Sequence, residues 1–310
     1  MAVISARTRK IIKASQISIF GNLFLSLVKI VAGFLAGSLA LVADGIDSAS
    51  DILASMITLF TARIISRPPD IKYPYGYDKA DTVASKLVAF VIFFAGAQLA
   101  ISTSQRLLEG KQPEMPSIIA IIVVLVSIVG KQFLAKYLKR IGDQIDSPML
   151  RANARNMQND VIISVSVLVG LVLTHVLKMP IIDSITALFV SIWIMVVAIR
   201  IIITSSRELM DGVNDPTIYR TISDAVAKVP DAKNPHRIRA RKMAHYYMIA
   251  LDVEVDGRKT LYEGHTIGHQ VESNIRELIP NIYDVVVHVE PTGDENPEEA
   301  YGISGKDMSL

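Results

Sequence analysis

Residues 39–53 read LALVADGIDSASDIL, so three aspartates interrupt a largely apolar stretch. Asp44, Asp47 and Asp51 are three and four positions apart, which places all three on one face of a helix. Carboxylates stacked in this way repel one another, and a divalent cation, bound protons or both would relieve the repulsion. Asp44, one turn away from the other two, has the simpler alternative of being wetted or hydrogen-bonded. The stretch therefore predicts a polar site on an apolar helix, centred on Asp47 and Asp51.

Apolar residues are gathered into blocks along the chain. The 310 residues are 51% hydrophobic, with a mean hydropathy of +0.38. A bilayer core about 30 Å thick needs roughly 20 apolar residues in a helix. Six segments meet this requirement, at about 13–36, 39–65, 80–107, 116–140, 148–176 and 182–208. The pattern predicts an α-helical membrane protein with six transmembrane helices, and it argues against an ordinary soluble enzyme, a disordered chain or a nucleic-acid binder.

The basic residues predict the orientation of this bundle. On one side of the membrane, three connections hold 14 Lys and Arg residues: Arg7, Arg9, Lys10, Lys13, Arg63, Arg67, Lys72, Lys79, Lys131, Lys136, Lys139, Arg140, Arg151 and Arg155. The other side holds three: Arg106, Lys111 and Lys178. The positive-inside rule then places both termini in the cytoplasm. Residues 213–310 carry 11 basic and 16 acidic residues, so an acidic C-terminal part lies in the cytoplasm.

A second polar segment matches the first. Residues 150–170 read LRANARNMQNDVIISVSVLVG, in which Asn156 and Asp160 are four apart. Asn153, about one turn earlier, is more typical of a hydrogen bond between membrane helices. Two such pairs on two helices can converge into a cage that offers only oxygen atoms. This donor set suits hard or borderline divalent ions. The chain contains no cysteine, which also excludes disulfides and thiolate metal sites.

These motifs together resemble the cation diffusion facilitator family, which exports divalent transition metals from the cytoplasm, usually as homodimers and in exchange for protons. The resemblance covers nearly the whole chain and lies in the six spans and four motifs: SLALVADGIDSASDI at 38–52, YPYGYDKAD at 73–81, LRANARNMQNDV at 150–161 and YDVVVHVEP at 283–291.

The resemblance implies a transport site at Asp47, Asp51, Asn156 and Asp160. Zinc-moving members usually have His at one or both of the positions held here by Asp47 and Asn156, so this chain is expected to favour Mn²⁺, then Fe²⁺, then Zn²⁺ or Co²⁺. An amide does not titrate, so exchanged protons would have to be carried by the three carboxylates.

Two further features of the family differ or recur here. Some members bind a second metal in the loop after span two, at positions that here are Asp70, Tyr73 and Tyr77. Neutral tyrosines replace imidazoles poorly, so we expect this loop site to be absent or very weak. Lys79 and Asp211 match a charge pair with which the family ties two protomers together. The alternative is an ordinary interfacial lysine and a helix-end aspartate.

The chain divides into a transmembrane domain at 1–212, a cytoplasmic domain at 213–292 and an acidic tail at 293–310 that is expected to be disordered. The middle part has an αββαβ pattern, which fits the small ferredoxin-like α+β domain of the family. His265 and His269 share one helical face. By resemblance, the cytoplasmic metal ligands are His236, Asp252, His265, His288 and Glu290, with His269 nearby.

The sequence predicts a divalent-metal/proton antiporter in a prokaryotic cell membrane, acting as a homodimer in the lipid bilayer. An intramembrane aspartyl protease also places aspartates on two spans, but such enzymes need a G-x-G-D type turn that this chain lacks. A membrane metal sensor without transport is the other alternative, and a flux assay in liposomes would separate it from an antiporter.

Overall fold

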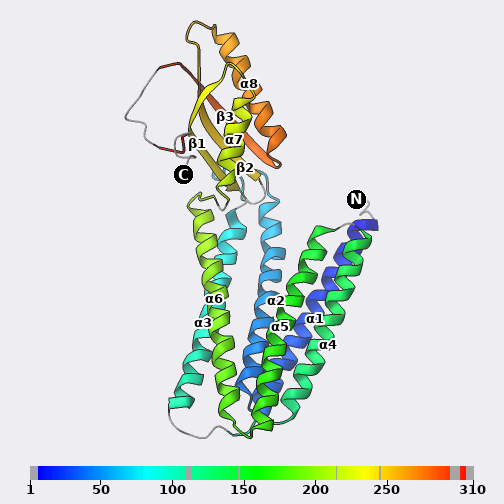
Figure 1. Cartoon of the computed structure of the whole chain (residues 1–310). Coiled ribbons are helices and arrows are strands. Elements are labelled where there is room, and N and C mark those ends of the chain that lie inside the picture. The colour runs from blue at the N-terminus through cyan, green and yellow to red at the C-terminus, as the bar shows by residue number, and fades with distance from the viewer. Residues whose placement is uncertain are drawn as a thin grey trace. The chain divides into compact units, whose positions relative to one another are not determined.

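This computed structural model describes residues 6–77, 79–108, 114–145, 147–213, 215–243, 246–293 and 301–304. Its N-terminal part consists of six long helices (Figure 1). The helices are α1 (Ala6–Ala36), α2 (Leu39–Ile65), α3 (Lys79–Leu108), α4 (Ile119–Gln144), α5 (Pro148–Val176) and α6 (Ile181–Leu209). All except α2 meet a length and hydropathy criterion for crossing a membrane. With 27 residues, α2 is about 40 Å long, which is enough for a span. The predicted six-helix membrane domain is confirmed.

Two compact units make up the chain. The first comprises Met1–Ala62 and Ala84–Ile202, and the second comprises Arg63–Val83 and Ile203–Leu310. The division therefore falls inside α2, α3 and α6, whose ends belong to the second unit together with the loop that joins α2 to α3.

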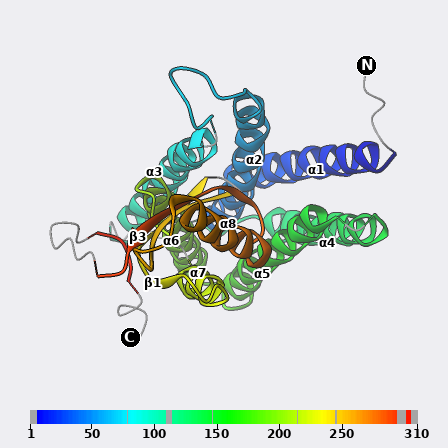
Figure 2. The ribbon, with the colours of Figure 1, turned by 90° about the horizontal axis from the view of Figure 1, so that it is seen from above.

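All six helices contribute to one apolar cluster in the membrane unit, with Leu41, Val88, Val124, Leu171 and Ile194 among its buried members. Within this unit α1 runs beside α4 (Figure 2), and a second cluster joins these two helices to α5. Many of the remaining large apolar side chains are exposed on the outside of the helices. That pattern is expected where lipid covers the outer faces.

The C-terminal part is a three-stranded sheet with two helices. Its elements are α7 (Thr217–Ala227), β1 (Lys233–Met243), β2 (Tyr246–Val255), α8 (Leu261–Leu278) and β3 (Ile282–Pro291), which confirms the predicted αββαβ order. β1 pairs antiparallel with β2, and β2 pairs parallel with β3. Both helices pack on one face of the sheet over a core of branched aliphatic side chains. A capping box between Thr260 and Glu263 fixes the start of α8.

A short piece of the tail joins this sheet. Ile303 forms an antiparallel bridge with Ile238 of β1, through reciprocal backbone hydrogen bonds of 2.9 and 3.0 Å. Gly302, with φ +83°, lies against the backbone of Arg237, where a Cβ atom would stand 2.7 Å from the carbonyl carbon. The acidic composition of 293–310 did not indicate this pairing. The rest of the tail, at 294–300 and 305–310, lies outside the described residues.

Candidate metal sites

The four transport-site candidates face one another across two helices of the membrane unit. α2 carries Asp47 and Asp51, and α5 carries Asn156 and Asp160, each pair one turn apart. The amide Nδ2 of Asn156 donates a hydrogen bond to Asp51 Oδ1 at 3.2 Å, and Asp51 also lies within hydrogen-bonding reach of Asp160. The i,i+4 spacing seen in both sequence motifs therefore brings the polar groups of the two helices into direct contact.

These four residues line a cavity of about 470 Å³. Its remaining walls come mainly from isoleucines of α3, α5 and α6, with Trp193 of α6 among them. The cavity is thus apolar except for one polar patch of three carboxyl groups and amide or hydroxyl oxygens. Carboxylate and amide oxygens are ligands that hard divalent cations prefer. The geometry can hold a dehydrated metal ion, or protons on the same carboxylates.

A lysine in the middle of α4 pairs with this site. The Lys131 ammonium lies 2.9 Å from Asp160 Oδ2, and the two side chains are only 1% and 10% exposed. Assigning Lys131 to a cytoplasmic connection was wrong, because the residue lies inside the helix Ile119–Gln144 and is buried. Without it, 13 basic residues still oppose three, so the predicted orientation is unchanged.

Asp44 belongs to a separate buried network. Its carboxylate lies 2.7 Å from Lys29 Nζ, and neither side chain is exposed. Lys29 also donates to Ser164 at 2.9 Å, and Ser164 donates to Asp44 Oδ1 at 2.8 Å. A Cβ atom on Gly45 would stand 3.0 Å from the backbone nitrogen of Ile30, so glycine permits the close approach of α1 and α2. Of the two ordinary roles considered for Asp44, the hydrogen-bonded one is correct and the wetted one is not.

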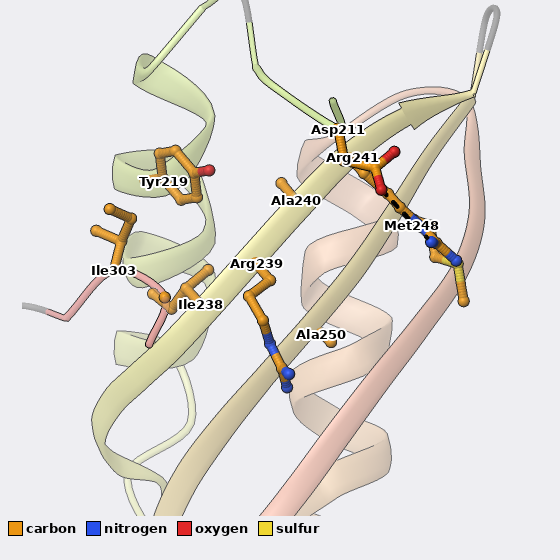
Figure 3. A pocket seen from close by; sticks show the side chains of 10 residues that line it. Asp211, Tyr219, Ile238, Arg239, Ala240, Arg241, Met248, Ala250 and Ile303 are labelled. Atoms are coloured by element: carbon orange, nitrogen blue, oxygen red, sulfur yellow. Dashed lines mark hydrogen bonds and ion pairs between the residues drawn. The ribbon is translucent and has the colours of Figure 1, made fainter. Parts of the chain in front are cut away.

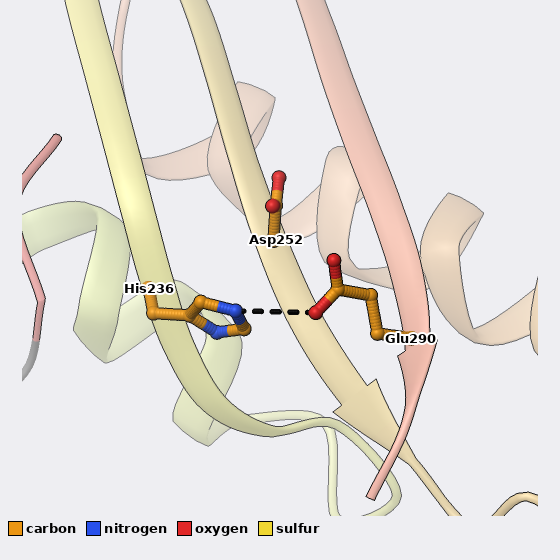
Figure 4. Close-up of side chains that lie close together, drawn as sticks. All are labelled: His236, Asp252 and Glu290. Atoms are coloured by element: carbon orange, nitrogen blue, oxygen red, sulfur yellow. Dashed lines mark ion pairs between the residues drawn. The ribbon is translucent and has the colours of Figure 1, made fainter. Parts of the chain in front are cut away.

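The strand register builds a second polar cluster in the cytoplasmic unit. His236 of β1 is the partner of Asp252 on β2, and Asp252 is the partner of His288 on β3. Glu290 follows two residues after His288 and therefore projects from the same face. His236 Nε2 lies 3.2 Å from Glu290 Oε2, and one ligand atom each from His236, Asp252 and Glu290 lie within 4.8 Å of one another (Figure 4).

The remaining predicted histidines differ in position. His288 Nδ1 lies 3.2 Å from Glu290 Oε1 and 3.7 Å from Asp252 Oδ2, but its side chain is 64% exposed. His265 and His269 stack edge to face on α8, with ring centroids 4.4 Å apart. Within the described residues, this pair is not part of the group formed by His236, Asp252 and Glu290. The structure therefore brings four of the five predicted cytoplasmic ligands together and leaves His265 on the helix.

An arginine pairs with the carboxylates of this cluster. The Arg237 guanidinium makes ion pairs with both Asp252 and Glu290. Neighbouring residues of a regular strand point to opposite faces, but β1 shifts register on both sides of His236, and Arg237 has φ +47°. This bulge allows His236 and Arg237 to reach the same carboxylates. A hydrogen bond to Tyr301, and then the charges of Asp252 and Glu290, raise the pKa of Arg237, so it remains a cation.

The loop between α2 and α3 is closed by its own hydrogen bonds. Tyr77 donates to Asp70 Oδ2 at 2.6 Å, and the backbone N–H groups of Lys72 and Tyr73 donate to Asp70 Oδ1. The hydrogen bond from Tyr77, and then that from Tyr73, hold the pKa of Asp70 below its usual range. Gly76, with φ +84°, supplies the turn. The three residues at the predicted loop position thus act here as a hydrogen-bonded turn.

Lys79 and Asp211 meet within the second unit. The Lys79 ammonium lies 2.6 Å from Asp211 Oδ1, and both side chains are more than two-fifths exposed. A cavity of about 540 Å³ adjoins Asp211 on the sheet face formed by β1 and β2 (Figure 3). Arg241 lines this cavity, and its guanidinium lies 3.9 Å from the Asp211 carboxylate and 4.6 Å from the ring centre of Tyr75. These contacts join the α2–α3 loop to the C-terminal sheet.

Comparisons with known proteins agree with this architecture. Residues 15–210 match the cation efflux transmembrane domain, and residues 215–292 match the cation efflux protein cytoplasmic domain. The chain belongs to the cation diffusion facilitator family. It is therefore a membrane transporter for metal cations, not an enzyme, and its C-terminal domain is the cytoplasmic, dimer-forming domain of the family. The bacterial and archaeal relatives place it in a prokaryotic cell membrane.

Two relatives and one solved domain illustrate the likeness. An uncharacterized transporter YdbO of Bacillus subtilis is 32% identical over 90% of this chain and 95% of its own length. The manganese efflux system protein MneS of the same organism is 31% identical over 89% and 93%. The metal-bound C-terminal domain of the CzcD transporter from Thermotoga maritima is 32% identical, with a TM-score of 0.25, and covers 26% of this chain and 92% of that domain.

Sequence reasoning missed three basic residues that touch the acidic groups. Lys29 and Lys131 each interrupt a long apolar segment, and this position was a signal that an acidic partner lies on a neighbouring helix. Arg237 left no comparable signal, because it lies in a run of basic residues and its contact depends on the bulge in β1.

Proposed function

We propose that the chain exports Mn²⁺ from the cytoplasm, with Fe²⁺ as the next substrate and Zn²⁺ or Co²⁺ after it. The observation that carries this proposal is that Asp47, Asp51, Asn156 and Asp160 line one cavity, where Asn156 donates a hydrogen bond to Asp51. The set offers carboxylate and amide oxygens and no imidazole or thiolate. Manganese accepts such ligands, whereas zinc and cobalt gain more from nitrogen or sulfur donors.

Protons are the proposed counter-substrate. A vacated site would leave three carboxylates close together in an apolar cavity, where their mutual repulsion favours proton uptake. Asn156 cannot take up a proton, so Asp47, Asp51 and Asp160 carry this role. Metal entering from the cytoplasm would displace the protons, and protons from outside would displace the metal. The manganese efflux relative described above supports the choice of metal for this cycle.

The cytoplasmic cluster is proposed as a second, regulatory metal site. His236, Asp252 and Glu290 supply one nitrogen and carboxylate oxygens, and His288 lies next to them. Such a mixed set suits Zn²⁺ as well as Mn²⁺. Metal bound here would stabilise one arrangement of the homodimer, to which the Lys79–Asp211 pair would also contribute. His265 and His269 would join only through a rearrangement or a second protomer.

The test is metal competition in proteoliposomes of the full-length protein with an imposed pH gradient. Mn²⁺ influx should be reduced most strongly by Fe²⁺ and less by Zn²⁺, Co²⁺ and Cd²⁺, and it should collapse when the gradient is dissipated. Flux of Zn²⁺ above that of Mn²⁺ at equal concentration would contradict the proposed metal. Flux that does not respond to the gradient would contradict proton exchange.

A further inference from the structure

The most unusual group beside the transport site is a buried lysine. Lys131 stands near the centre of α4, with about 18 Å of helix on either side. Its ammonium lies 2.9 Å from Asp160 Oδ2 and is 1% exposed. It does not line the cavity; its ion pair with Asp160 ties it to the site, and its charge also acts on Asp47 and Asp51.

With a divalent metal bound, the charges of the site sum to zero only when Lys131 is included. Asp47, Asp51 and Asp160 contribute three negative charges, and Lys131 contributes one positive charge. One divalent cation then brings the group to neutrality. Lys29 and Asp44 are also nearby, but they neutralise each other at 2.7 Å. Moving net charge through a low-dielectric bundle is costly, so a neutral loaded site favours transport.

We propose that Lys131 is the charge-balancing residue of the transport site. It lowers the affinity of the site for the metal ion, which allows the ion to leave. The inference rests on the proposed transport role of the four oxygen ligands. Lys131 holds Oδ2 of Asp160, which restricts Asp160 to binding the metal through Oδ1. Its positive charge also opposes the cation electrostatically. Both effects lower affinity for a divalent ion without removing a ligand.

A purely structural lysine would behave in the opposite way. If Lys131 served only to hold Asp160 in place, its loss would disorder a ligand and weaken metal binding. If it balances charge, its loss tightens binding and slows release. The sign of the affinity change therefore separates the two roles, and loss of transport alone would not.

The experiment measures Mn²⁺ affinity of the full-length protein in detergent by titration calorimetry, with Asp252→Ala present throughout to weaken the cytoplasmic site. Lys131→Met removes the charge and keeps an unbranched side chain of similar length. Lys131→Arg keeps the charge, and Lys136→Gln removes an exposed charge five residues along the same helix. We expect Lys131→Met to tighten the Kd by about tenfold or more, Lys131→Arg to stay closer to the wild-type Kd than Lys131→Met, and Lys136→Gln to stay within about twofold. Mn²⁺ flux by Lys131→Met should fall at the same time, because release becomes slow.

An unchanged or weaker Kd for a dimeric Lys131→Met protein would overturn the inference. Should that variant fail to fold, the comparison passes to Lys131→Gln/Asp160→Asn against Asp160→Asn, since the double variant removes both members of the buried ion pair. The double variant should bind more tightly than the single one, and equal or weaker binding rejects the role. Asp51→Ala separates this result from the underlying assignment. If Asp51→Ala binds Mn²⁺ normally, the transport site itself is misplaced, whereas if it loses binding while Lys131→Met changes nothing, only the role of Lys131 fails.

Discussion

The two candidate metal sites solve the same electrostatic problem in different ways. In the membrane, helical spacing gathers three acids and an amide, and Lys131 pairs with an oxygen of Asp160 from outside the cavity. In the cytoplasmic domain, strand register gathers two acids and two histidines, and Arg237 lies among the ligands and pairs with both acids. A metal can therefore enter the first site without displacing the base. In the second site, it must displace the base.

This difference in the position of the base suits different tasks. The proposed transport site must bind and release metal within each cycle, so an opposing charge that leaves the cavity open would favour release. A regulatory site must have two distinct states, and in the proposed cytoplasmic site exchange of arginine for a metal ion would supply them.

The largest expected effect comes from removing a transport carboxylate. Asp51→Ala or Asp160→Ala should reduce Mn²⁺ flux in proteoliposomes to the level of protein-free vesicles, because the cation loses a charged ligand and the charge balance at once. Both variants should remain dimeric by size-exclusion chromatography. The matched control is Asp143→Ala, an exposed acid on α4 that should transport normally. Normal Mn²⁺ uptake by either site variant would remove Asp51 or Asp160 from the site.

The sequence predicted much of this site because its spacing is local. An i,i+4 pair shares a helical face whatever the helix packs against, so the pairs on α2 and α5 could be recognised without the fold. The contact of Lys131 with the site could not be recognised from the sequence, because it depends on where α4 ends and on which residue of α5 the lysine meets. Similarly, alternation on β3 indicated that His288 and Glu290 share a face, whereas the two register shifts that turn Arg237 towards them are not visible in the residue types.

The buried pair Lys29–Asp44 is an internal reference for the comparison, because it joins a base to an acid in the membrane unit without any proposed ligand. Lys29→Met should destabilise the protein by about 3–5 kcal/mol, since it leaves the Asp44 carboxylate buried and unpaired. Thermal unfolding in detergent measures this loss. Lys29→Met/Asp44→Leu should recover much of it, and Lys136→Gln should have no effect. An equally unstable double variant would show that the pair has a role beyond charge neutralisation.

Removal of Arg237 from the cytoplasmic cluster should have a smaller effect, and it should strengthen metal binding where removal of a transport carboxylate abolishes transport. Asp51→Ala is present to silence the transport site. In this background, Arg237→Gln should tighten Zn²⁺ binding by about tenfold, because the metal no longer has to displace a guanidinium from the two carboxylates. Calorimetry of the full-length protein measures this. Arg239→Gln is the matched control, because this neighbouring arginine is exposed and stacks on Tyr301. Weaker binding in Arg237→Gln would mean that the arginine supports the site and does not block it.

The smallest expected effect concerns selectivity. Asn156→His adds an imidazole to the oxygen cage and should raise Zn²⁺ transport relative to Mn²⁺ by about fivefold, because zinc gains more than manganese from a nitrogen ligand. The ratio of the two fluxes in the same vesicles is the measurement, since it is insensitive to the amount of protein. Asn159→His places an imidazole on the wall of the same cavity without replacing a proposed ligand, and it should leave the ratio unchanged. An unaltered ratio in Asn156→His would place metal selectivity outside the four-residue cage, and the contrast between an oxygen-only membrane site and a mixed cytoplasmic site would then not explain which metal is carried.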